Sequence, residues 1–190
     1  MDGKILLIID AQYDFINGSL AVDGALEMMH NVADFILENG PSYNEIVLTA
    51  DWHPNTHCSF KENGGIWPQH CVQFTNGAAI YQPIMDALDK IGRMPLVLTK
   101  GTDEDHEQYS IFKNEISKTK LIKLCDWTNT THIDCCGIAL DYCVKDTISD
   151  GLRELPNVDF NLLLNMTPSI GNKDEVIKFF EDKERVCMLG

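Results

Sequence analysis

Short runs rich in apolar residues recur along the chain, separated by more polar segments. A run that is apolar at nearly every position is typical of a strand buried on both faces, as in a parallel sheet. The runs predict six strands, at residues 5–9, 46–50, 96–99, 133–136, 158–164 and 186–189. The first three end directly at Asp10, Asp51 and Lys100. In an open α/β sheet, ligands bind at the edge where the strands end, so we expect these three residues at a site.

Between the strands, apolar residues recur at intervals of three and four, which is the spacing of a helix. The predicted helices lie around residues 26–37, 84–91, 121–124 and 176–180, the third of them short. Gly40-Pro41 supplies a stop signal for the first. Asp141 is predicted to be the N-cap of a further helix that runs to about Gly151. This alternation predicts a three-layer α/β/α fold, Rossmann-like, with a mainly parallel sheet and right-handed crossovers.

The length of 190 residues favours one domain spanning residues 1–190, with enough chain for a substantial core. The formal net charge of −14 argues against nucleic acid or an anionic membrane as a partner, because both require basic patches. The seven cysteines are odd in number and form no C-x-x-C motif, which indicates a reducing compartment. With no signal peptide and no membrane span in the sequence, we expect a cytoplasmic protein. Its oligomeric state stays open, a homo-oligomer included.

The segment 51–79 breaks the alternation of strand and helix, and overlong loops of this kind are usually functional. Asp51 and His53 are two residues apart, so in extended chain their side chains point to the same side. Together with His70 they offer a carboxylate and two imidazoles, which suit zinc, iron or manganese and leave coordination positions open. The alternative is that these are ordinary loop histidines. His57 ranks below His53 and His70 as a ligand.

Cys143 is the cysteine whose position favours reactivity, because it follows the predicted cap Asp141 by two residues. A helix N-terminus stabilises a thiolate, and its free N–H groups can bind an oxyanion. No histidine accompanies this cysteine, so Asp10 would have to activate the thiol, with Lys100 providing positive charge. Asp10 can equally be a structural carboxylate that accepts hydrogen bonds from loop amides. We interpret the other six cysteines as small buried hydrophobes.

Seven segments, in this order along the chain, resemble the nicotinamidases (pyrazinamidases) of the isochorismatase-like hydrolase superfamily. They are IIDAQYDF (8–15), GSLAV (18–22), DWHP (51–54), WPQHCV (67–72), KG (100–101), YSIF (109–112) and GIALDYCV (137–144). Each is weak alone, whereas the colinear set is specific. The resemblance implies the fold of that superfamily. It also implies hydrolysis of nicotinamide to nicotinate and ammonia through a cysteine thioester, in NAD salvage.

The resemblance also implies roles for individual residues. The implied catalytic triad is Asp10, Lys100 and Cys143. The implied ligands of one divalent ion, expected to be zinc with iron or manganese as alternatives, are Asp51, His53 and His70, with Ser59 at a place of a further contact. The Ile138–Ala139 bond resembles the family's cis peptide, which implies oxyanion-binding N–H groups near Ala139 and Cys143. The implied walls around a pyridine ring are Phe15, Trp67, Tyr109 and Ala139.

Three other functions stay open at this level. The first is a related amidohydrolase or isochorismatase-type hydrolase that acts on another small molecule. The second is a hydrolase in which the metal itself supplies the nucleophile, and there the metal would be essential and Cys143 dispensable. The third is a metal-binding or regulatory module without catalytic activity, against which the complete set of Asp10, Lys100 and Cys143 argues.

Overall fold

Six parallel strands form one sheet in the computed structural model, which describes residues 2–190. The strands are β1 (Gly3–Ile9), β2 (Glu45–Asp51), β3 (Leu96–Lys100), β4 (Thr130–Gly137), β5 (Asp159–Leu163) and β6 (Val186–Leu189). Their order in the sheet is β3-β2-β1-β4-β5-β6, and every neighbouring pair is parallel. The predicted parallel sheet of about six strands is thereby confirmed.

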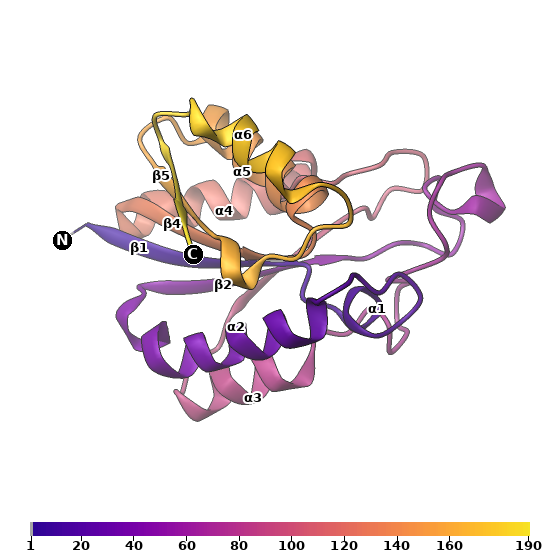
Figure 1. Cartoon of the computed structure of the whole chain (residues 1–190), viewed down its shortest axis with the longest axis horizontal. Coiled ribbons are helices and arrows are strands. Elements are labelled where there is room, and N and C mark those ends of the chain that lie inside the picture. The colour runs from indigo at the N-terminus through magenta and orange to yellow at the C-terminus, as the bar shows by residue number, and fades with distance from the viewer. Residues whose placement is uncertain (1) are drawn as a thin grey trace.

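Helices cover both faces of this sheet, as Figure 1 shows. They are α1 (Tyr13–Ile16), α2 (Ala25–Asn39), α3 (Gln82–Lys90), α4 (Glu115–Thr128), α5 (Lys145–Glu154) and α6 (Lys173–Glu181). Leu6 and Ile8 of β1 face the core beneath α2 and α3, whereas Leu7 and Ile9 face the core beneath α4, α5 and α6. Because side chains alternate along a strand, a strand between two helix layers must be apolar at every position. The three-layer α/β/α fold is confirmed.

The helix predicted as a short element at 121–124 is fourteen residues long, as α4. Its start is set by Asn114, whose side chain accepts a hydrogen bond from the backbone N–H of Ser117. Only one narrow side is buried, while Ile116 and Trp127 are 69% and 75% exposed. The apolar residues therefore lie on both sides of the helix, and the pattern along the sequence understates its length.

The prediction that Asp141 caps a helix is wrong. The helical chain begins one residue earlier, with a single π-helical turn at Leu140–Val144 that continues directly into α5. Asp141 lies inside this turn, and its carboxylate instead accepts hydrogen bonds from the N–H groups of Ile170 and Gly171, at 3.0 and 2.7 Å. The same carboxylate that could cap its own helix therefore ties that turn to a distant loop.

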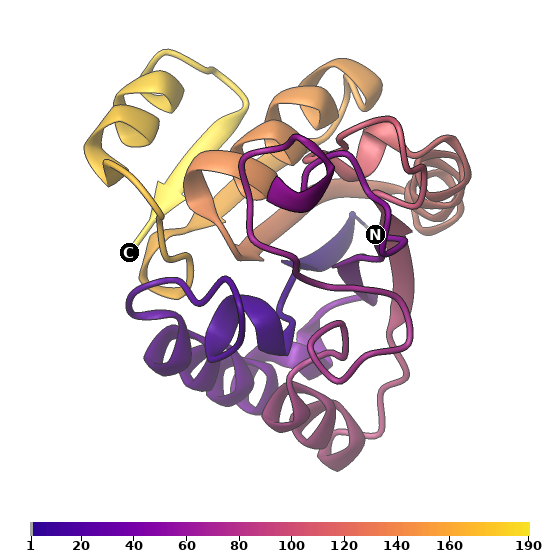
Figure 2. The ribbon, with the colours of Figure 1, turned by 90° about the vertical axis from the view of Figure 1, so that its right-hand side faces the viewer.

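Loops gather at the carboxyl edge of the sheet, which Figure 2 shows end-on. The largest is the segment after β2, an irregular stretch with one short 3-10 turn at Lys61–Asn63, in agreement with the expected long loop. Asp10, directly after β1, has a φ of 50°, so the chain turns sharply at the strand end. Within residues 2–190, no helix has the length and apolar character that crossing a bilayer requires.

Candidate active site

Three side chains from separate parts of the sheet meet at its carboxyl edge. The Nζ of Lys100 lies 2.7 Å from Oδ2 of Asp10 and 3.2 Å from Sγ of Cys143. Asp10 and Lys100 are completely buried, and Cys143 is 6% exposed. The ends of β1 and β3 and the turn after β4 thus bring together an acid, an amine and a thiol.

Asp10 is held by the neighbouring strand β2. Its Oδ1 accepts a hydrogen bond of 2.6 Å from Oγ1 of Thr49, and its N–H donates to the carbonyl of Thr49 at 3.1 Å. Burial raises the pKa of Asp10 above its ordinary value, and the attraction of Lys100 only partly offsets this. A carboxylate with a raised pKa is a better proton acceptor, as a general base requires.

Lys100 is shared between two carboxylates. Its Nζ also lies 2.5 Å from Oδ1 of Asp51, so the ammonium bridges Asp10 and Asp51. Burial alone would lower the pKa of Lys100, but these two ion pairs hold it well above the ordinary value. The side chain therefore stays a cation, and it places a fixed positive charge beside the Cys143 sulfur.

The position of Cys143 favours a thiolate, whereas its burial opposes one. The residue does lie in the first helical turn after β4, yet burial raises the pKa of its thiol well above the ordinary value, and Lys100 does not reverse this. The cause is desolvation, which sequence position cannot reveal. Burial thus favours the protonated thiol, and the titratable groups next to it include Asp10 and Lys100.

A second cluster adjoins the first through Asp51. Asp51, His53 and His70 each offer one ligand atom, and these atoms all lie within 4.8 Å of one another. All three residues are buried. Burial raises the pKa of Asp51, but the positive charge of Lys100 holds this pKa well below its usual range. The carboxylate is therefore ionised, as a metal ligand must be.

The two histidines present the same ring nitrogen to this cluster. Nδ1 of His53 lies 2.8 Å from the carbonyl of Gly101, and Nδ1 of His70 lies 2.8 Å from the carbonyl of Pro68. A carbonyl only accepts, so each Nδ1 carries a proton, and in the neutral form of each ring the lone pair is on Nε2. Nε2 of His53 lies 3.5 Å from Oδ2 of Asp51, and this carboxylate raises the pKa of His53 above its ordinary value against the effect of burial. Nε2 of His53 is buried and has no hydrogen-bond partner among the described residues. An orphaned buried acceptor beside a carboxylate fits a bound divalent ion.

His57 and Ser59 lie next to this cluster and contact each other. Nδ1 of His57 is 2.7 Å from Oγ of Ser59, and the His57 ring packs on His53 with centroids 4.0 Å apart. Burial lowers the pKa of His57 to about 4, so this imidazole is neutral. His57 forms a separate group of ligand-type atoms with His53 and Glu107, and it does not join Asp51 and His70.

A pocket opens beside both clusters and is lined mostly by aromatic and apolar side chains. Nε1 of Trp67 donates to the Tyr109 hydroxyl at 3.0 Å, and the Tyr142 ring packs on both at centroid distances of 5.1 and 5.3 Å. The complete lining is Phe15, Leu20, Asp51, Trp67, His70, Glu107, Tyr109, Ala139, Tyr142, Cys143 and Ile170. The four residues expected around a ring, Phe15, Trp67, Tyr109 and Ala139, therefore share one pocket with the thiol and two metal-type ligands.

No protein-family model matches the chain. A nicotinamidase of Saccharomyces cerevisiae is 31% identical to it over 202 residues, which cover 92% of each protein. This chain belongs to the nicotinamidase family, within the isochorismatase-like hydrolases. Two solved structures share the fold over 98% of the chain. One is a Pyrococcus horikoshii pyrazinamidase in complex with zinc (28% identity, 98% of that protein, TM-score 0.82). The other is PnC1 of L. infantum in complex with nicotinate (31% identity, 92% of that protein, TM-score 0.84).

The backbone near the nucleophile is also arranged as this family membership suggests. The Ile138–Ala139 peptide bond is cis. The N–H of Ile138 donates to the carbonyl of Ile9 at 2.8 Å, so it is not available to a ligand. The N–H of Ala139 has no hydrogen-bond partner among the described residues, and Ala139 itself lines the pocket. Ala139, and Cys143 in the first helical turn, are therefore the positions from which backbone donors can reach an oxyanion.

Sequence reasoning missed several residues that build the site. Gln12 holds Asp51 in place: its side-chain amide donates to the Asp51 carbonyl and accepts from the Asp51 N–H, both at 2.7 Å. Phe60 is fully buried, and its ring packs against His53 and His70. The pocket walls that were missed are Leu20, Glu107, Tyr142 and Ile170. Gln12, Leu20 and Tyr142 stand inside segments that resemble the family, whereas Phe60, Glu107 and Ile170 carry no signal of their own.

Proposed function

We propose that this protein hydrolyses nicotinamide to nicotinate and ammonia through a thioester on Cys143. The observation that carries the proposal is the convergence of Asp10, Lys100 and Cys143 on one pocket that also holds Asp51 and His70. Membership of the nicotinamidase family supports the substrate, as does the nicotinate complex of the L. infantum neighbour. A pyridine carboxamide places its two reactive features, the ring nitrogen and the amide, on one small molecule. The two clusters can therefore each hold one of them.

In the first half-reaction, Asp10 accepts the proton of the Cys143 thiol and the sulfur attacks the carboxamide carbon. The Lys100 ammonium lies 3.2 Å from the sulfur, so it stabilises the negative charge that the sulfur carries as a thiolate before the attack. Backbone N–H groups at Ala139 and Cys143 then bind the oxyanion. Asp10 returns its proton to the leaving nitrogen, the carbon–nitrogen bond breaks, and ammonia departs.

In the second half-reaction, water replaces ammonia. Asp10, now ionised again, accepts a proton from the water as its oxygen attacks the thioester carbonyl. The carbon–sulfur bond breaks, the sulfur regains a proton from Asp10, and the carboxylic acid gives its remaining proton to solvent and leaves as nicotinate. Lys100 remains charged throughout, because its raised pKa keeps it from competing for the moving proton.

Asp51, His53 and His70 would hold one divalent ion, which we propose to be zinc. The zinc complex of the P. horikoshii neighbour supports this choice, as do two imidazoles and one carboxylate as donors. Such an ion supplies a Lewis acid for the ring nitrogen and so orients the substrate. Phe15, which lies against His70 with ring centroids 5.4 Å apart, and Trp67 would enclose the ring between them.

The metabolic role and the compartment follow from this activity and from the thiols. We place the reaction in NAD salvage, because it converts the amide form of the pyridine into the acid. Seven free cysteines, five of them buried in the two cores, are typical of a reducing compartment, so we propose the cytoplasm.

Ammonia release from nicotinamide by the purified protein tests the proposal. Benzamide is the matched control, because it carries the carboxamide but lacks the ring nitrogen, and we expect it to be turned over far more slowly. A metal-water mechanism predicts that Cys143→Ala keeps its activity and that chelation abolishes it. Absence of turnover with nicotinamide and related amides would leave only a binding module.

A further inference from the structure

The reaction pocket is narrow. The free space between its walls is about 20 Å³, which is room for about one water molecule. A six-membered ring does not fit into this space, so at least one wall has to move when a substrate binds. The position of the neighbouring empty space indicates which wall moves.

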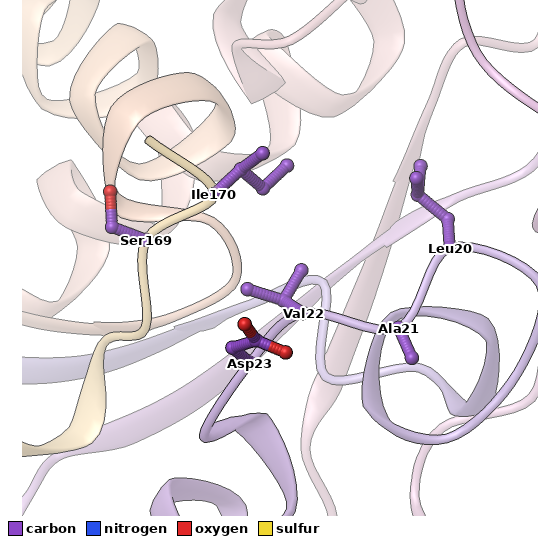
Figure 3. Close-up of a pocket in the computed structure, with 6 residues that line it drawn as sticks. All are labelled: Leu20, Ala21, Val22, Asp23, Ser169 and Ile170. Carbon is purple, nitrogen blue, oxygen red and sulfur yellow. The ribbon is translucent and has the colours of Figure 1, made fainter. Parts of the chain in front are cut away.

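A larger cavity lies directly beside the pocket. It measures about 240 Å³, is drawn in Figure 3, and is lined by Leu20, Ala21, Val22, Asp23, Ser169 and Ile170. Leu20 and Ile170 also line the reaction pocket, so these two side chains stand between the two spaces. Figure 3 shows that the lining comes from two separate segments, the loop before α2 and the loop before α6.

Leu20 and Ile170 together form a partition between the two spaces. Both residues are held by hydrogen bonds of their backbone and not of their side chains. The N–H of Leu20 donates to the Asp14 carbonyl at 3.0 Å, and the N–H of Ile170 donates to the Asp141 carboxylate at 3.0 Å. The two apolar side chains form no hydrogen bonds, and Ile170 is 44% exposed. By contrast, Trp67 on the aromatic side is fixed by its hydrogen bond to Tyr109. The Leu20 and Ile170 side chains can therefore turn into the cavity while their loops stay in place.

The cavity is lined by both apolar and polar residues. Val22 is buried beside Leu20, whereas Asp23 is exposed and presents a carboxylate. Ser169 also lines the cavity, but its hydroxyl oxygen is buried. A group that occupies this space would be apolar near the ring and would end in a hydrogen-bond donor, ideally a cation.

We propose that this cavity is a subsite for substituents on the ring of the carboxamide substrate, with Leu20 and Ile170 as the residues that set specificity. The inference rests on the proposed function, because it assumes that the ring lies in the adjoining pocket. The ligand class is an aromatic primary carboxamide that carries a short alkyl chain, with an amine preferred at its end. Unsubstituted nicotinamide needs only the displacement of the partition.

The test measures kcat/KM for nicotinamide and for nicotinamides that carry an ethyl or an aminoethyl group on a ring carbon away from the carboxamide. The variants are Leu20→Ala, Ile170→Ala and the double variant, and the readout is the ratio of the substituted to the unsubstituted substrate. We expect the double variant to raise this ratio by about ten-fold or more. Ile116→Ala is the control, since it removes the same group from the exposed face of α4 and should leave the ratio unchanged.

A second pair of variants tests the polar end. Asp23→Asn should lower the preference for the aminoethyl over the ethyl compound by about two- to five-fold, because the carboxylate is exposed and screened. Asp34→Asn, an exposed carboxylate of α2, is the control. An unchanged ratio in the double variant, or rejection of substituted amides by every variant, would overturn the subsite. If the unaltered protein does not hydrolyse nicotinamide, the proposed function fails instead.

Discussion

At the scale of single residues, the chemistry of Cys143 is set by burial rather than by its place in a helix. Its thiol keeps a raised pKa although a lysine ammonium lies 3.2 Å away. In the proposed reaction, the nucleophile is therefore formed by transfer of the thiol proton to Asp10. The Asp10 carboxylate is then as necessary to that reaction as the sulfur.

The first prediction concerns replacement of Cys143. Cys143→Ala removes the attacking atom but leaves the metal ligands and the aromatic walls, so nicotinamide should still bind while kcat falls by about a thousand-fold or more. Asp10→Asn should behave alike, since an amide cannot accept the thiol proton. Steady-state kinetics and calorimetry measure both effects. Cys187→Ala, at an exposed cysteine, is the control, and near-normal kcat in Cys143→Ala would refute covalent catalysis.

The second prediction concerns pH. Because burial raises the pKa of the Cys143 thiol, the reactive thiolate is scarce at neutral pH and increases as the pH rises towards that pKa. In metal-free protein, alkylation of Cys143 by iodoacetamide should therefore still be accelerating above about pH 9. Peptide mapping at a series of pH values gives the rate. A rate that is already constant at pH 7 would mean a stable thiolate.

At the scale of elements, the site depends on hydrogen bonds that tie the end of one strand to the next segment. Gln12 lies just after β1, and its side chain pairs with the backbone of Asp51 at the end of β2. The same amide donates to the carbonyl of Ala78, at the far end of the long loop. One side chain therefore connects the strand that leads to Asp10 with the strand that carries Asp51, a proposed metal ligand, and with the loop after it.

The third prediction follows from this connection. Gln12→Leu should weaken binding of a divalent ion by about ten-fold or more, because a buried N–H and carbonyl of Asp51 lose their partners and the carboxylate loses its position. Zinc titration followed by calorimetry measures the change. Gln69→Leu is the matched control, since Gln69 is an exposed residue of the same loop. Equal affinity in both variants would show that Asp51 is positioned without Gln12.

At the scale of the whole molecule, the three proposed ligands come from one strand end and two places in a long loop, so the bound ion should stabilise the assembled fold. A ligand that binds only the folded state, at a free concentration a hundred times its Kd, raises the free energy of unfolding by about 2.7 kcal/mol. For a protein of this size, the thermal midpoint should rise by about 5–10 °C.

The fourth prediction tests this stabilisation. Chelation should lower the thermal midpoint by that amount and abolish turnover of nicotinamide, and zinc should restore both. His53→Ala should lose most of the shift and raise KM, because the ion no longer holds the ring nitrogen. His132→Ala, a half-exposed histidine near the start of β4, should keep the full shift. Scanning calorimetry gives the midpoints, and an unchanged midpoint after complete chelation would contradict the shared site.

The sequence alone determines the layers of this molecule and the edge at which its chemistry lies. Consecutive apolar residues require burial on both faces, so the strands are parallel and lie between helices, and their ends must share one edge. The sequence therefore predicts that Asp10, Asp51, Lys100 and Cys143 lie at one edge of the sheet, and its short segments also indicate the family. These inferences succeed because they depend on the spacing of apolar residues along the sequence and on short local segments.

Tertiary structure alone decides the environment of those groups. The pKa of Cys143, the sharing of Lys100 between two carboxylates and the clamp of Gln12 on Asp51 all depend on distances between segments that are tens of residues apart. Asp141 shows the limit most clearly: the local pattern favours a helix cap, yet its carboxylate binds the N–H groups of a loop 29 residues further on. Desolvation and long-range hydrogen bonds are properties of the packed chain, and no local period encodes them.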